Sequence, residues 1–440
     1  MKLILRTVAG FLVVACLGAF LTVAAELASE SVAVALDETT TTTAPKVTTT
    51  TSRSTTTTTI RSERAATVEA PATPGVYVSE VAGFGESMVQ VATGVAAIIG
   101  VGPNPSAAPV AVTSLGEFQE RVPNPSPSLA ASVQQFFANG GSQALIKGAS
   151  GASASSILPA IGESLPVGAD LLVVADLSAL PQSDWLPVAV AMGRAASASL
   201  SIALIDPPQS AVAQAASSAG SLSALTSLGT ELRAASGTAA NSILLFASNV
   251  VNASGATLPV SPLFAGLIAA TDVSDGFWNA PNGFGSTFAS VRPQFASTME
   301  QDGLLQESGL SPLMYVPGRG TAVLSDRLLS GPSDYLSVER TLNTIQATIT
   351  NGLVSYVFAA NDGVTWSSVT QAVSGYLEGL FTQGALLGNS ASDAYSVACG
   401  VGSTMTGQDL LNGFMVVNVE VAVDRPGSFD QISIKQQMGN

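Results

Sequence analysis

The sequence predicts a mixed α/β chain of several domains. Three short apolar runs, 170–175, 200–205 and 243–246, have the pattern of strands buried on both faces. Alanine-rich stretches around 185–197 and 209–236 lie between these runs and predict helices. Strand and helix therefore alternate through the middle of the chain, which indicates a layer of parallel strands covered by helices. With 440 residues, the chain can hold two or three such domains.

The region before this layer also mixes strands with a helix. Four short apolar segments predict strands at 76–78, 91–101, 110–112 and 144–147. Between the third and the fourth, apolar residues recur at helical spacing, and a glycine pair then stops the helix. These residues are Leu129, Val133, Phe136 and Phe137, followed by Asn139, Gly140 and Gly141.

The region after the layer predicts two helices and several strands. The helical patterns run from Val338 to Ile349 and from Trp366 to Phe381, with an apolar strand at 354–358 between them. Valines alternate with other residues over 417–423, which predicts a strand with one face toward a core. A second alternating strand closes the chain around 431–436.

The first 73 residues have a different composition. Residues 1–26 form a signal or membrane-anchor segment, in which Lys2 and Arg6 precede an uncharged apolar run. An uncleaved anchor, a cleaved signal peptide, lipoprotein processing at Cys16 and a misplaced start codon all fit this pattern. Residues 27–73 contain three threonine runs and predict a disordered low-complexity linker, typical of chains that are exported.

Composition excludes several function classes. The chain has no histidine, which removes histidine-dependent triads and histidine-ligated zinc. It has no P-loop and no nucleophile elbow, and we predict no catalytic residue, cofactor or metal. The net charge of −15 argues against a nucleic-acid partner. Asp272, Asp275 and Asn279 lack calcium-loop spacing and predict a turn, while Cys399 predicts a buried, inert thiol.

Only 11% of the residues are charged and 47% are apolar. Such a chain can leave little surface bare, so we expect extensive burial between subunits or beside a membrane. Because the copies would carry like charges, their association would depend on apolar and main-chain contacts.

Short motifs in a fixed order resemble the contractile tail sheath proteins of phages and related injection systems. They extend from the first predicted strand almost to the last. The motif residues are Pro74, Gly75, Asn139, Gly140, Gly141, Trp278, Pro281, Pro317, Gly318, Arg319, Gly320, Thr404, Met405 and Thr406.

The resemblance implies a multidomain fold in which the N- and C-terminal segments form a shared conserved domain with an α/β middle domain inserted. The expected domains are 74–151, 152–332 and 333–440. The implied role is a structural, non-enzymatic sheath subunit that polymerises around an inner tube and contracts to drive the tube through a target envelope. Its expected partners are other copies, the tube protein, baseplate and tail-terminator components. The expected location is the sheath of a phage tail or phage-tail-like particle.

The resemblance also implies strand exchange between neighbouring copies, in which main-chain hydrogen bonds supply affinity. The expected donors are Val76, Tyr77 and Val78 near one end and Ile432, Ser433 and Ile434 near the other. An ordinary edge strand within the same domain is the alternative for both segments. The alternative function is a membrane-anchored surface scaffold that retains the sheath fold and contacts the membrane through residues 1–26.

Overall fold

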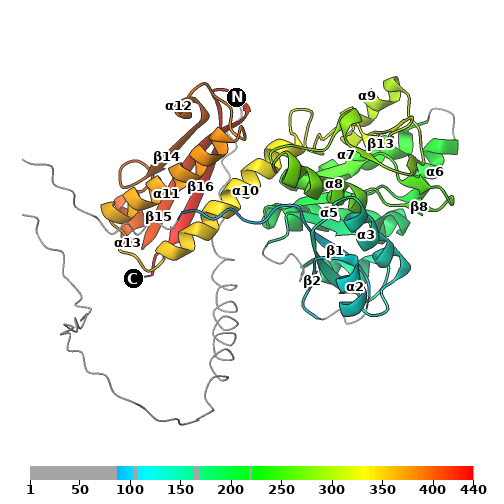
Figure 1. The fold of residues 1–440 in the computed structure, drawn as a ribbon, viewed down its shortest axis with the longest axis horizontal. Helices are drawn as coiled ribbons and strands as arrows, with labels where there is room; N and C mark the ends of the chain where they lie inside the picture. The colour runs from blue at the N-terminus through cyan, green and yellow to red at the C-terminus, as the bar shows by residue number, and fades with distance from the viewer. Residues whose placement is uncertain (1–86, 103–106, 163–167, 218–220, 440) are drawn as a thin grey trace, which may run out of the picture. The chain divides into compact units, whose positions relative to one another are not determined.

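The computed structural model describes residues 87–102, 107–162, 168–217 and 221–439, drawn as a coloured ribbon in Figure 1. The signal or anchor segment 1–26, the threonine-rich segment 27–73 and the first predicted strand, 76–78, lie outside the described residues. Among the residues that are described, no helix combines the length and the apolar character needed to cross a bilayer.

Seven strands form one sheet in the order β11-β6-β5-β4-β1-β3-β2. All neighbours are parallel except β2, which runs antiparallel to β3. The strands are β1 (Val95–Val101), β2 (Val110–Val112), β3 (Gln143–Ala149), β4 (Leu171–Val174), β5 (Ile202–Ile205), β6 (Ile243–Phe246) and β11 (Leu310–Ser311). The parallel layer that the apolar runs predict is confirmed, because β4, β5 and β6 coincide with those runs.

Helices cover both faces of this sheet (Figure 1). Along β1, Ala96 and Ile98 face one apolar core, while Ala97 and Ile99 face the other. This explains why the buried strands read as continuous apolar runs. The first core packs against α2 (Leu115–Arg121), α3 (Pro127–Ala138) and α8 (Ser261–Ser274). The second packs against α4 (Ala154–Gly162), α5 (Gln182–Ala198), α6 (Gln209–Ser217), α7 (Ser223–Ser236) and α9 (Met299–Glu307).

Two small antiparallel sheets and three short 3-10 helices complete the described part of this α/β body. One sheet has the order β10-β7-β8 and the other β12-β13-β9. Their strands are β7 (Val250–Asn252), β8 (Thr257–Leu258), β9 (Thr287–Phe288), β10 (Val291–Pro293), β12 (Leu313–Val316) and β13 (Gly320–Val323). The 3-10 helices are η2 (Leu177–Ala179), η3 (Gly237–Ser242) and η4 (Gly283–Gly285), and η5 (Val354–Tyr356) follows later in the chain.

The C-terminal part is a three-stranded antiparallel sheet, β14-β15-β16, with two long helices against one face. The strands are β14 (Tyr395–Cys399), β15 (Phe414–Arg425) and β16 (Ser428–Gln437), and the helices are α10 (Leu336–Leu353), α11 (Gly363–Thr382), α12 (Ala391–Ala394) and α13 (Gly407–Leu411). Val417, Val419 and Val421 point into the core and are fully buried. The predicted one-sided strand is therefore confirmed.

Two predictions about individual elements are wrong. The segment 354–358 is not a strand, because the chain continues from α10 into the 3-10 helix η5. A short apolar run cannot distinguish a strand from the end of a buried helix. The single helical stretch expected at 209–236 is two helices, α6 and α7.

The mixed α/β class is confirmed, but the boundary expected after residue 151 divides a hydrogen-bonded sheet. Strand β1 pairs with β3 on one side and with β4 on the other, so residues 95–149 share a sheet with the middle region. Of the described N-terminal residues, Met88 joins the apolar core beneath the C-terminal sheet.

Candidate functional site: the edge of the C-terminal sheet

Strand β14 forms one edge of the C-terminal sheet. Within the described residues its main chain pairs with β15 alone, through the register Tyr395↔Val421 to Cys399↔Val417. Its five residues, Tyr395–Cys399, include no charged side chain. An uncharged edge of this kind offers main-chain donors and acceptors to an incoming strand, and proteins usually protect such edges with charge or proline.

A groove of about 500 Å³ lies beside this edge, between β14 and the first half of α11. It is lined by Gly363, Trp366, Ser367, Thr370, Gln371 and Cys399. Asp362 begins α11 as its N-cap, since its carboxylate accepts the N–H groups of Val364 and Thr365. The Trp366 indole N–H donates to Asn361 Oδ1 at 2.8 Å, which fixes the ring in the groove wall.

The surroundings of this groove are apolar and open. Val364 is 66% exposed and Val401 is 47% exposed. Burial raises the pKa of the Cys399 thiol to about 11, so the thiol stays protonated at neutral pH. The side chain is only half-buried, although the sequence predicts a buried one. The groove therefore has room for an extended segment but offers no ionised nucleophile.

Strand β16 forms the other edge, and it contains the predicted donor residues Ile432, Ser433 and Ile434. They pair in order with Val419, Asn418 and Val417 of β15. Ile432 and Ile434 are buried in the core, and the Ser433 hydroxyl donates to Asn418 Oδ1 at 2.8 Å. These three residues thus form an edge strand of their own sheet. The first predicted donor, Val76 to Val78, lies outside the described residues.

The two ends of the described chain meet beside the end of α10. The Met88 side chain packs so closely on Gly352 that a Cβ there would lie 2.0 Å from its sulfur. At the other end, the Gly439 N–H donates to the Val357 carbonyl at 2.7 Å. The N-terminal segment therefore enters the described part of the chain next to the C-terminal sheet.

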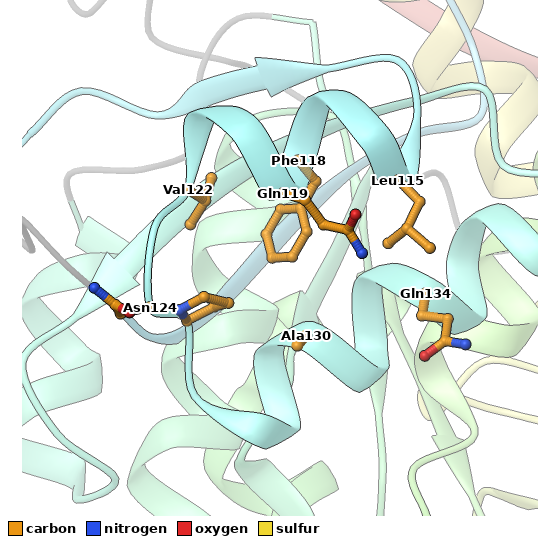
Figure 2. Close-up of a pocket in the computed structure, with 8 residues that line it drawn as sticks. Leu115, Phe118, Gln119, Val122, Asn124, Ala130 and Gln134 are labelled. Carbon is orange, nitrogen blue, oxygen red and sulfur yellow. The ribbon is translucent and has the colours of Figure 1, made fainter.

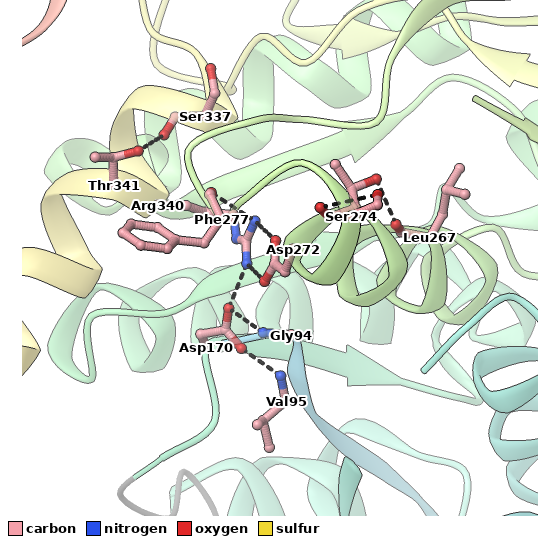
Figure 3. A network of polar contacts seen from close by, with 11 residues as sticks. Gly94, Val95, Asp170, Leu267, Asp272, Ser274, Phe277, Ser337, Arg340 and Thr341 are labelled. Atoms are coloured by element: carbon pink, nitrogen blue, oxygen red, sulfur yellow. Dashed lines mark hydrogen bonds and ion pairs between the residues drawn. The ribbon is translucent and has the colours of Figure 1, made fainter. Parts of the chain in front are cut away.

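A buried ion cluster connects α10 with the α/β body (Figure 3). Arg340 donates from Nη1 and Nη2 to the two carboxylate oxygens of Asp272 at 2.8 and 2.6 Å, and from Nη2 to Asp170 at 2.8 Å. The side chains of Arg340 and Asp272 are only 2% and 3% exposed. Asp170 also accepts the main-chain N–H groups of Gly94 and Val95 at 3.1 and 2.7 Å. One arginine thus ties together α10, α8, the start of β4 and the start of β1.

Burial and charge oppose each other in this cluster. Burial raises the pKa of Asp272, although the Arg340 charge lowers it. Burial lowers the pKa of Arg340, but the Asp170 and Asp272 charges outweigh burial and hold that pKa above its usual value. Arg340 therefore stays charged at every pH at which the protein is folded.

The α/β body has a separate surface cavity of about 250 Å³ between α2 and α3 (Figure 2). It is lined by Leu115, Phe118, Gln119, Val122, Asn124, Pro125, Ala130 and Gln134. None of these side chains titrates, so the cavity offers no acid, base or nucleophile. Across the described residues, no group of three or more Cys, Asp or Glu side chains could hold a metal ion.

The whole fold matches solved structures of contractile sheaths. The chain is 26% identical to a chain of the contracted anti-feeding prophage baseplate, covering 83% of this chain and 99% of that one at a TM-score of 0.63. It is 23% identical to the contracted PVC sheath of an extracellular contractile injection system, covering 84% and 98% at a TM-score of 0.61. The sheath tail protein of Desulfitobacterium hafniense is 8% identical to this chain. The match covers 83% of this chain and 100% of that one, at a TM-score of 0.57.

The chain shares the fold of contractile tail sheath proteins. No family profile and no curated protein matches it by sequence. The alternative of a membrane-anchored scaffold gains no support from the matched structures.

The residues of the sheath-like motifs shape loops and helix ends in this chain. Asn139, Gly140 and Gly141 end α3, and a Cβ on Gly140 would lie 2.6 Å from the Ala270 side chain of α8. The 317–320 motif turns the chain from β12 into β13, where Arg319 donates to the Phe284 carbonyl at 3.2 Å. The structure therefore assigns both motifs to packing within the α/β body.

The other motif residues lie around the C-terminal core. Trp278 packs edge-on against Phe277 and contacts this core, and Pro281 is buried nearby in the chain. The Thr404 hydroxyl donates to the Val416 carbonyl at 2.7 Å, and Met405 is buried. Thr406 caps α13. Pro74 and Gly75 lie outside the described residues.

The sequence does not predict the Arg340 cluster. Asp272 is expected in a turn, but it lies on α8 and pairs with Arg340. The sequence does contain a signal for a buried charge at Arg340. This residue follows Leu336 by four positions, so it lies on the core-facing side of the predicted helix. The partner Asp170 is 170 residues away and could not be identified without the fold.

Proposed function

We propose that this protein is a structural subunit of a contractile sheath, working without enzymatic chemistry. The observation that carries the proposal is that nearly the full length of known sheath chains superposes on this one. Its place would be the sheath of a phage tail or phage-tail-like particle. Its partners would be further copies, the inner tube protein, and baseplate and tail-terminator components.

The proposed contact between copies is strand addition at β14. The edge of β16 carries Asp430 and Lys435, whereas β14 carries no charge, so β14 is the less protected edge. The groove between β14 and α11 offers room for alternate side chains of an added strand. The main chain would supply the affinity, which suits copies that share a net charge of −15.

The proposed donor is the N-terminal arm, residues 75–81, of a neighbouring copy. Donation by residues 431–436 would require β16 to leave β15 and would expose Ile432 and Ile434. Burying each such side chain contributes about 2 kcal/mol, which favours keeping β16 in its own sheet. Because donor and acceptor are different surfaces, the contact is heterologous and propagates into a ring or a helix.

Contraction would follow from a change in how these linked copies pack. An arm that stays paired with its neighbour keeps the copies connected while their bodies move. The extended assembly would be metastable, so that a trigger releases it without nucleotide hydrolysis. The shortening sheath would then drive the inner tube through a target envelope.

Two substitutions at Tyr77 test the proposal in the full chain. Tyr77→Pro removes a main-chain donor from the arm, whereas Tyr77→Ala shortens the side chain and keeps that donor. We expect negative-stain micrographs to show tubes or rings for the wild type and for Tyr77→Ala, and none for Tyr77→Pro. Wild-type protein that remains monomeric over a wide range of concentration would overturn the sheath role. Tubes formed equally by both variants would overturn strand addition.

A further inference from the structure

The segment that leads from the N-terminal arm into the body lies along α10. Met88 packs on Gly352, and the Val91 N–H donates to the Thr348 hydroxyl oxygen at 3.2 Å. Further along, the Val95 N–H donates to Asp170, which binds Arg340 (Figure 3). Residues 340, 348 and 352 are multiples of four apart, so they form a stripe along one side of the helix.

The segment is long enough to follow this part of α10. Arg340 and Gly352 are twelve positions apart, which corresponds to about 18 Å along the helix. Met88 and Val95 are seven positions apart, so an extended chain between them reaches at most about 23 Å. The reach exceeds the span, which leaves room for the bend at Gly94, and the order of the contacts shows that the segment runs antiparallel to α10.

The inner end of this segment is fixed more firmly than its outer end. At the outer end, Met88 packs into the C-terminal core and Val91 makes one neutral hydrogen bond, so no charged group holds the segment there. The inner end has two hydrogen bonds to a carboxylate that is itself paired with buried Arg340. Gly94 adds a close approach, because its φ is +70° and a Cβ would lie 2.8 Å from the Ala269 main chain of α8.

We propose that Arg340, acting through Asp170, is the positioning residue that anchors the N-terminal arm. This rests on the proposed function, in which the arm is held by a neighbouring copy. Tension on the arm then acts along α10 and reaches the sheet at β1, which lies between β4 and β3. Because the contacts are spread along the segment, they share the load, and the body follows its neighbour as one unit.

Asp176 provides a matched control for Asp170. The two aspartates flank β4, and each accepts a main-chain N–H from one end of β1. Asp170 accepts from Val95 at 2.7 Å, and Asp176 accepts from Val101 at 3.1 Å and from the Ser128 hydroxyl. Of these two aspartates, only Asp170 binds Arg340 and the main chain of Gly94, where the segment from the arm enters β1. Asp170→Asn and Asp176→Asn therefore remove the same charge at opposite ends of the same strand.

The first measurement is hydrogen exchange on the unassembled full chain. In Asp170→Asn we expect the amides of 91–95 to exchange about tenfold faster than in the wild type, while the amides of β4 and β5 keep their protection. In Asp176→Asn we expect 91–95 to be unchanged. Thr348→Val is a milder second variant, for which faster exchange should be limited to Val91 and its neighbours. Equal acceleration throughout the sheet in Asp170→Asn would overturn the proposal, since Asp170 would then hold the whole fold.

The second measurement is the length of assembled tubes after controlled shear. Asp170→Asn should form tubes at the wild-type protein concentration, yet break to about half the wild-type length or less, because its arms detach from their bodies. Asp176→Asn tubes should keep the wild-type length, and equal lengths for all three proteins would overturn the proposal. If the wild type forms no tubes, the sheath function fails, while hydrogen exchange still decides whether Arg340 and Asp170 hold the arm.

Discussion

The Asp206 carboxylate accepts the main-chain N–H of Val260 at 2.6 Å, across 54 residues of sequence. It also accepts the N–H and the hydroxyl of Ser261. Val260 occupies the N-cap position of α8 but its side chain accepts no hydrogen bond. Asp206, which follows β5, accepts the N–H groups at this helix end instead. The sheet and the helix on its face are thus joined by a buried carboxylate at the positive end of the helix.

This carboxylate should make stability depend on pH. Burial raises the pKa of Asp206 to about 6 from an ordinary 3.8, although its hydrogen bonds to Ser261 and Val260 lower it. The folded state then binds the proton more tightly than the unfolded state does. The resulting stabilisation is complete below about pH 4 and disappears as the pH rises through 6, with a total of about 3 kcal/mol.

The measurement is the free energy of unfolding of wild type and Asp206→Asn at several pH values. We expect the wild type to gain stability relative to the variant as the pH falls from about 7 to about 4. The comparison with the variant removes the contributions of the other carboxylates. If the wild type instead loses stability relative to Asp206→Asn as the pH falls, the hydrogen bonds from Val260 and Ser261 outweigh burial and lower the pKa of Asp206.

Trp185→Phe should destabilise the same region. Trp185 is fully buried, and its indole N–H donates to the Asp206 carbonyl at 2.8 Å. The variant leaves that buried carbonyl without its partner and removes part of a large side chain, at an expected cost of about 2–3 kcal/mol in denaturant unfolding. Trp366→Phe is the matched control. Its indole N–H also donates to an oxygen, but at the half-buried groove, so a clearly smaller loss is expected.

The sequence predicts the sheet of the body because its central strands, β4, β5 and β6, are buried on two faces. Continuous apolar runs such as those of β4 and β6 are typical of strands that are covered on both faces. The helices α3 and α11 are predictable for a related reason, since their apolar residues repeat with the helical period. Where a short apolar run follows a helix, as at Val354, the run has too few residues for its spacing to distinguish a strand from a helix.

The candidate site could be predicted only in part. Motif order leads to the family and to the chain ends, but the choice of acceptor edge depends on which strand lies outermost. That order, β14-β15-β16, follows from tertiary packing and has no signature in the sequence of β14. The Arg340 cluster is similar, because its partners come from three distant segments that only the folded sheet brings together.

Cys399 should report whether the groove beside β14 is filled. In a Cys16→Ser background it is the only thiol of the chain. Because burial raises its pKa to about 11, we expect slow alkylation at neutral pH and faster alkylation as the pH approaches that value. In assembled tubes we expect a further fall of about tenfold or more in the rate, since the added strand covers the groove.

The control for this experiment is a thiol on the α/β body, away from β14 in the fold. Ser254→Cys, at the exposed turn between β7 and β8, serves in a chain that also carries Cys16→Ser and Cys399→Ser. Its alkylation rate should be the same before and after assembly. If Cys399 keeps its rate in tubes while tubes are plainly present, the acceptor edge lies elsewhere, and β16 becomes the candidate.

Assembly should become more favourable as salt is added. The chain carries −15 charges, and the charged groups bonded to β14 are the carboxylates of Glu378 and Glu420, which accept the hydroxyl groups of Tyr395 and Ser396, so this edge adds no positive charge to the contact. Salt therefore screens repulsion between copies and leaves the main-chain attraction intact, as the Debye length falls from about 30 Å at 0.01 M to about 10 Å at 0.1 M. The critical concentration for tubes, measured by sedimentation, should fall over this range. A critical concentration that instead rises with salt would show that ion pairs between copies, and not strand addition at an uncharged edge, hold the assembly together.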